Sequence, residues 1–253
     1  MKGFLIFKHA LTMVLRNWKQ AIMLGALPVG IIVAAAVLLL RAHMDSFVAT
    51  GLNEFEFASQ GSGAGAAFFL VWIISVACML WVMVNWHRYV ILEEYPSGWI
   101  PPFHADRILG YLGRILLLAL VMFVVMIPIG IGAAVFAAIA PPLALVFMAV
   151  AYIAVIILMY RLVVIMPAAA IGKPIGLKDA LEATRGANLD IAVLLVTLFL
   201  ANFAVQIVGG LIVFLVPVVG IVALVVCGFI FALTGVSVLT TFYGHYIEGR
   251  PIG

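Results

Sequence analysis

Residues 115–160 read ILLLALVMFVVMIPIGIGAAVFAAIAPPLALVFMAVAYIAVIILMY and contain no charged side chain. A helix crosses the hydrocarbon core of a bilayer with about 20 apolar residues, so this stretch is too long for one crossing and suits two. Pro141 and Pro142 interrupt it, because proline lacks a backbone N–H donor and clashes with the preceding turn. The stretch therefore predicts two membrane-spanning helices that reverse at the two prolines.

Three further apolar runs complete a set of six predicted spans. Residues 21–40 suit one crossing, residues 57–86 a second, and residues 191–247 two more, with the last reversal expected at Gly209-Gly210, Pro217 and Gly220. The chain is 67% hydrophobic and 9% charged, whereas a soluble domain carries roughly 25% charged residues. We therefore expect an all-α, polytopic membrane bundle in which residues 1–253 form a single integral membrane domain.

The basic residues predict the orientation of the spans. All but one of the 13 Lys and Arg residues fall on one predicted side: Lys2, Lys8, Arg16, Lys19, Arg88, Arg107, Arg114, Arg161, Lys173, Lys178, Arg185 and Arg250. Only Arg41 falls on the other side, in the predicted outer loop of residues 41–64. An excess of Lys and Arg in short loops marks the cytoplasmic side of a membrane. We therefore expect a protein of a bacterial-type inner membrane with both termini in the cytoplasm. Nucleic acid is not an expected partner, because these residues lie at span ends and do not gather on one exposed face.

The first 20 residues predict an amphipathic helix. At 100° per residue, Phe4, Phe7, Leu11, Val14, Leu15 and Trp18 share one face and the basic residues share the other. Such a helix lies in the membrane interface with its apolar face toward the acyl chains. The alternative is a helix packed on the protein's own cytoplasmic face, which has the same periodicity.

A Pro-x-Gly motif recurs at nearly equal spacing. It is Pro96-Ser97-Gly98, then Pro174-Ile175-Gly176, then Pro251-Ile252-Gly253. Each copy follows an aromatic and basic cluster at the end of an even-numbered span. We therefore predict three repeats, residues 1–98, 99–176 and 177–253, each an interfacial helix followed by a helical hairpin. All three begin on the same side, so the repeats are parallel rather than inverted.

Residues 166–188, MPAAAIGKPIGLKDALEATRGAN, carry a family resemblance. A Pro-Ala pair, a Gly-Lys pair and an amphipathic stretch ending in Thr-Arg-Gly resemble a loop of bacterial six-helix membrane proteins. These proteins are grouped with the membrane domain of glycerophosphodiester phosphodiesterases. Trp86-His87-Arg88 supports the resemblance, while Ala187 displaces the Asn that follows this Gly in the family. The resemblance implies the membrane portion of such proteins without the soluble phosphodiesterase barrel.

Motifs for catalysis are absent from the sequence. It contains no HExxH metal motif, no Walker loop and no GxSxG nucleophile elbow. Cys78 and Cys227 lie inside apolar runs, where a free cysteine behaves as a small hydrophobe. We therefore expect a non-enzymatic protein with no cofactor and no metal site.

Two amides are the first candidate site. Asn202 and Gln206 lie four residues apart in the predicted fifth span, so they share one helix face near mid-membrane. Amides in lipid either bond across helices or line a polar path, and both interpretations stay open here.

The aromatic and basic residues at the ends of the even-numbered spans are the second candidate site. Trp and Tyr at this depth are ordinary interfacial anchors. A guanidinium also binds phosphate oxygens, and basic pockets between helices bind anionic headgroups. The predicted headgroup residues are Trp86, His87, Arg88, Tyr160, Arg161, Tyr243 and His245.

These features predict a protein that handles or organises lipid, or that serves as an accessory subunit of a membrane complex. Its expected partners are membrane lipids, anionic ones above all, with a partner membrane protein or a second copy also compatible. The alternative is a permease-like transporter of a small apolar or amphiphilic substrate.

The orientation can be tested by labelling single cysteines introduced at Ser59 and Ser97 in intact cells with an impermeant maleimide. We expect labelling at position 59 and none at position 97, because the positive-inside rule places residues 41–64 outside and residue 97 inside. Labelling at position 97 alone would contradict the predicted topology.

Overall fold

The computed structural model describes residues 2–41, 47–49, 55–57 and 62–252. Six of its helices are long and apolar enough to cross a membrane, which confirms the predicted helical membrane bundle. They are α2 (Trp18–Arg41), α3 (Ser62–Leu92), α4 (Ala105–Ile139), α5 (Pro141–Leu162), α8 (Asn188–Leu215) and α9 (Pro217–Tyr246).

Shorter elements precede or connect the six long helices. They are α1 (Lys2–Arg16), α6 (Ile165–Ala170), α7 (Leu177–Ala183) and two antiparallel strands, β1 (Phe47–Ala49) and β2 (Phe55–Phe57). Phe47 pairs with Phe57 in the strand register. The rest of the predicted outer loop, residues 42–46, 50–54 and 58–61, lies outside the described residues.

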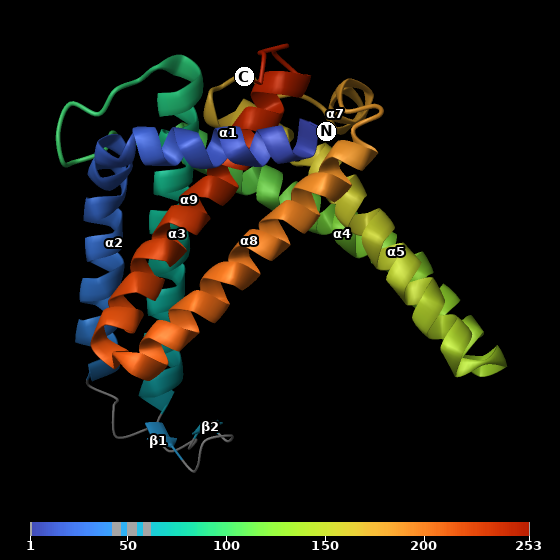
Figure 1. Ribbon diagram of the computed structural model, residues 1–253, viewed down its shortest axis with the longest axis horizontal. Coiled ribbons are helices and arrows are strands. Elements are labelled where there is room, and N and C mark those ends of the chain that lie inside the picture. Colours follow the sequence, from blue (N-terminus) through green and yellow to red (C-terminus); the bar gives the residue numbers. More distant parts are fainter. Residues whose placement is uncertain (1, 42–46, 50–54, 58–61, 253) are drawn as a thin grey trace.

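The long helices form three hairpins, α2–α3, α4–α5 and α8–α9 (Figure 1). Both termini lie at one end of the bundle together with α1, α6 and α7 (Figure 1), and we name this end the terminal side. The α4–α5 and α8–α9 reversals lie at the other end, the distal side. Each predicted repeat unit thus contains one hairpin.

Prolines produce both distal reversals. Ala140 and Val216 adopt non-helical backbone conformations, with φ −160° and −140°, and a proline follows each at the first position of the next helix. A residue before proline is driven out of the helical region, so the preceding helix ends there. Both predicted reversals are confirmed at these prolines. The expected contribution of Gly209-Gly210 is wrong, because both residues lie inside α8.

Helix α1 crosses the terminal side of the bundle and packs on α8 and α9 (Figure 1). Its buried residues include Ile6, Ala10 and Val14. Leu15 and Trp18 are exposed, with Trp18 at 62%. The amphipathic helix is therefore confirmed, and its buried face follows the alternative interpretation, a helix packed on the protein itself.

The contact between α1 and α8 is very close at Gly3. A Cβ at this position would overlap the backbone carbonyl oxygen of Asp190. The Asp190 carboxylate accepts a hydrogen bond from the Lys2 backbone N–H at 3.1 Å and another from the Tyr246 hydroxyl at 3.0 Å. Residues of α1, α8 and α9 are thereby joined at one carboxylate.

The ends of the repeats show one shared backbone feature. Gly172 and Gly249 occupy matching positions in the second and third units, and both have left-handed backbone angles, with φ +80° and +69°. Glycine adopts this region without the steric cost that a Cβ brings. The arrangement of the chain as three parallel repeats stays a prediction.

Substitution of Gly3 by Ala should lower the thermal midpoint in mild detergent, because the added methyl group would push α1 away from α8. Overpacking costs on the order of 1–3 kcal/mol, which corresponds to a fall of at least about 2 °C. Gly113→Ala is the matched control, since a Cβ there meets nothing within 4 Å. An unchanged midpoint in Gly3→Ala would contradict the close α1 contact.

Candidate functional site

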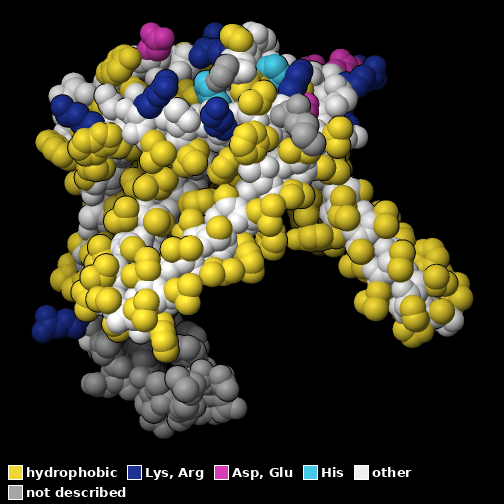
Figure 2. Space-filling model, viewed as in Figure 1, with side chains coloured by type: hydrophobic (Ala, Val, Ile, Leu, Met, Phe, Trp, Pro, Cys, Tyr) yellow, Lys and Arg dark blue, Asp and Glu magenta, His cyan; other side chains and the backbone are white. Residues whose placement is uncertain are grey.

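Helices α5 and α8 contact each other near the terminal side and diverge toward the distal side (Figure 1). A cavity of about 420 Å³ lies where they separate. Its walls are Tyr152, Ile153, Ile156 and Ile157 of α5 and Ala192, Leu195, Val196 and Phe199 of α8. Figure 2 shows the two arms as separate walls covered by hydrophobic side chains with a hollow between them. We name this feature the α5–α8 cleft.

The cleft exists because the α4–α5 hairpin packs on the bundle only near its terminal end. The buried residues of α4 are Ile108, Tyr111 and Leu118, and those of α5 are Val155 and Leu162. Residues 119–154, all of them described, include none that is buried. The distal part of the hairpin therefore projects away from α8 and leaves the cleft open on its side.

A second, smaller cavity extends the cleft toward the terminal side. It has a volume of about 250 Å³ and is lined by Ala154, Ile157, Leu158, Arg161 and Asn188. Ile157 also lines the larger cavity, so the two are adjacent. The combined space reaches from the middle of α5 to the level of the first residue of α8.

Arg161 is the only charged residue among the described ones that lines either cavity, and it bonds to helix α7 and the residue after it. Its Nε donates to the Thr184 hydroxyl at 3.3 Å and its Nη2 donates to the Leu181 carbonyl oxygen at 2.5 Å. Cationic groups near the C-terminus of a helix interact favourably with its carbonyl groups. Two of the three guanidinium nitrogens are thus used within the protein.

Asn202 and Gln206 lie on the face of α8 that forms the cleft wall. The positions 192, 195, 199, 202 and 206 alternate steps of three and four residues, which places them in one stripe along a helix. Both amides are exposed, and neither has a hydrogen-bond partner among the described residues. An amide placed in a medium without hydrogen-bonding groups costs about 4–8 kcal/mol unless it is paired. These two side chains therefore require a partner from outside the described fold.

Two predicted headgroup residues on α3 are instead buried in its contact with α9. Trp86 is fully buried, and its Nε1 donates to the Ser237 hydroxyl at 2.7 Å. The imidazole of His87, also fully buried, lies 2.8 Å from the Thr240 hydroxyl. In this position both side chains join helices.

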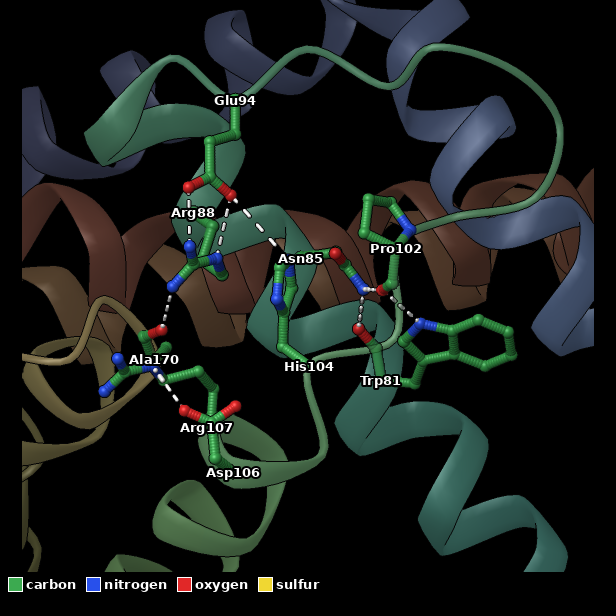
Figure 3. A network of polar contacts seen from close by, with 9 residues as sticks. All are labelled: Trp81, Asn85, Arg88, Glu94, Pro102, His104, Asp106, Arg107 and Ala170. Carbon is green, nitrogen blue, oxygen red and sulfur yellow. Dashed lines mark hydrogen bonds and ion pairs between the residues drawn. The ribbon is translucent and has the colours of Figure 1, made fainter.

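Arg88 joins three segments of the terminal side (Figure 3). Its guanidinium forms two hydrogen bonds with the Glu94 carboxylate, at 2.8 and 2.5 Å, and donates a third to the Ala170 carbonyl oxygen at 3.1 Å. His104 lies 3.9 Å from the same carboxylate. The arginine side chain is only 12% exposed. It therefore connects α3 to the following loop and to the end of α6.

The loop after α3 is fastened by a second group of hydrogen bonds in the same view (Figure 3). The indole Nε1 of Trp81 donates to the Pro102 carbonyl oxygen at 2.8 Å, and the amide of Asn85 donates to the same oxygen at 3.1 Å. Both side chains come from α3, so the loop is held against the helix that precedes it. Sequence reasoning did not identify either role.

The remaining predicted headgroup residues lie near the ends of α5 and α9. Tyr243 is buried, Tyr160 is partly buried, and His245 Nδ1 lies 3.0 Å from the Arg250 carbonyl oxygen. Arg88, Arg161 and His245 thus each contact a different segment of the protein: α6, α7 and the C-terminal residues. Their proposed role as one anionic headgroup site stays a prediction.

Sequence reasoning found the two amides of the cleft but not its walls. Tyr152 lies inside an uncharged run, where nothing in the sequence marks it as a site residue. The stripe from Ala192 to Phe199 has the 3-4 spacing that any buried helix face shows. This spacing predicts that the stripe forms one face of α8, but only the position of α5 in the fold shows that this face lines an opening.

The comparisons with known proteins identify no relative of this chain. No family model, curated protein or solved structure matches the chain. The resemblance to the membrane domain of glycerophosphodiester phosphodiesterases therefore stays an expectation, and the conclusion that stands is that this chain is a multi-pass helical membrane protein.

Proposed function

We propose that this protein handles membrane lipids without catalysing a reaction, and that the α5–α8 cleft binds lipid acyl chains. The observation that carries the proposal is the cavity of about 420 Å³ that opens between two membrane-spanning helices. Its volume is in the range of small-molecule binding sites, which are about 300–1,000 Å³. Seven of its eight lining residues are apolar and the eighth is Tyr152, which suits a hydrocarbon chain and not an ion or a sugar.

The direction of the opening supports a ligand that arrives from within the bilayer. Each wall belongs to a membrane-spanning helix, and the exposed residues around the cleft are hydrophobic, as in Ile153 and Phe199. A lipid enters such a site by lateral diffusion without leaving the hydrocarbon. The excess of basic residues on the terminal side supports a location in a bacterial-type inner membrane, with the terminal side facing the cytoplasm.

Filling the cleft should reduce lipid binding. In Ala192→Trp an indole occupies the cavity, so we expect at least a several-fold loss of lipid retained through mild detergent purification, measured by native mass spectrometry. Val226→Trp is the control, because this residue is 52% exposed on α9 and does not line the cleft. Equal retention in the two variants would contradict the proposal.

A permease-like transporter is the second candidate, and the unpaired amides of Asn202 and Gln206 favour it. Amides at mid-membrane can line a water-filled path. A single cysteine in place of Gln206, with Cys78 and Cys227 replaced by Ala, distinguishes the candidates. Under the lipid proposal, we expect a water-soluble maleimide to leave this position unlabelled in cells, because the cleft holds hydrocarbon. Labelling would support the transporter instead.

A further inference from the structure

We infer that the lipid bound in the α5–α8 cleft is an uncharged amphiphile whose hydroxyl and carbonyl groups are bound by Tyr152 in the cavity and by Asn202 and Gln206 beyond it. This inference rests on the proposed function, because it names the class of lipid that the same cleft takes. The chemistry fits a diacylglycerol, which has apolar chains and an uncharged head with hydroxyl and carbonyl groups.

Asn202 and Gln206 supply the polar groups on the α8 wall. They continue the stripe of Ala192, Leu195 and Phe199 by one and two helical turns, so they lie beyond the cavity on the same face. An amide carries two donors and an acceptor. Together the two side chains can donate to a carbonyl oxygen and accept from a hydroxyl group.

Tyr152 supplies a polar group on the opposite wall. It lines the cavity from α5 and is 63% exposed, and among the described residues its hydroxyl has no hydrogen-bond partner. A largely apolar pocket with a few polar groups from separate elements is the usual form of a small-molecule site. The two walls come from different hairpins of one chain, and a ligand between them contacts both.

The absence of charged residues in the cleft indicates which class of lipid head group it binds. No Asp, Glu, Lys or Arg occurs in residues 115–160 or 191–247, so the described walls at this depth offer no counter-ion. A phosphate moved to this depth would lose its hydration without a cation to replace it. Arg161 lies nearer the terminal side and donates to α7. An uncharged head avoids this cost.

The test compares two photoactivatable lipids with identical acyl chains, a diacylglycerol and a phosphatidylglycerol, on the full chain in nanodiscs. We expect the diacylglycerol to crosslink to α5 and α8 at least about fivefold more than the phosphatidylglycerol. In the double variant Asn202→Leu/Gln206→Leu this preference should be lost. Tyr152→Phe should reduce it, because only the hydroxyl group is removed. Peptide mapping by mass spectrometry gives both measurements.

Thr197→Val is the matched control. It also removes a hydrogen-bonding group from α8, but the Thr197 hydroxyl donates to the Val193 carbonyl oxygen at 2.7 Å and the residue does not line the cleft. We expect this variant to keep the full preference for diacylglycerol. A similar loss in Thr197→Val and in the double variant would overturn the inference.

The outcomes separate this inference from the proposed function. If neither probe crosslinks to α5 and α8, the proposed function fails and the inference fails with it. If both probes crosslink there equally, or if phosphatidylglycerol is preferred, the lipid-binding cleft stands and the uncharged head is wrong. If the double variant converts a dimer to a monomer by light scattering, the amides pair with a second copy and the inference is overturned.

Discussion

The arrangement of the spans depends on the contact of α1 with the terminal ends of α8 and α9. Gly3 lets the α1 backbone approach α8 so closely that a side chain would not fit. Asp190 then accepts hydrogen bonds from the Lys2 backbone and from Tyr246. In lipid, apolar surface gives no driving force for helix association, so close packing and hydrogen bonds between helices must hold them together. Both are present at this contact.

The same distribution explains why the distal part of the molecule is open. Within the described residues, the polar groups that join helices, among them His87, Arg88 and Arg161, lie toward the terminal side and bond to other segments there. The distal half of the α4–α5 hairpin has no such group. Its apolar surface can face lipid chains without a cost in free energy. It can therefore diverge from α8, and the divergence creates the α5–α8 cleft.

The polar side chains consequently divide into two groups with different roles. On the terminal side, several polar side chains bond to other segments of the protein, as Trp86 does to Ser237 and Asn85 does to Pro102. Asn202 and Gln206 are exposed at membrane depth with no partner among the described residues. Side chains of the first group stabilise the fold, whereas those of the second are available to a ligand.

The six spans, both proline reversals and the amphipathic α1 could be predicted from the sequence, because these features depend on local composition and on the backbone chemistry of proline. The sequence also identified Asn202 and Gln206, since an amide inside an apolar run is visible without a structure. The bonds of Arg88 to α6 and of Arg161 to α7, and the divergence of α5 from α8, could be seen only in the folded structure. These features depend on which helices meet, and apolar runs of equal hydropathy do not specify their neighbours.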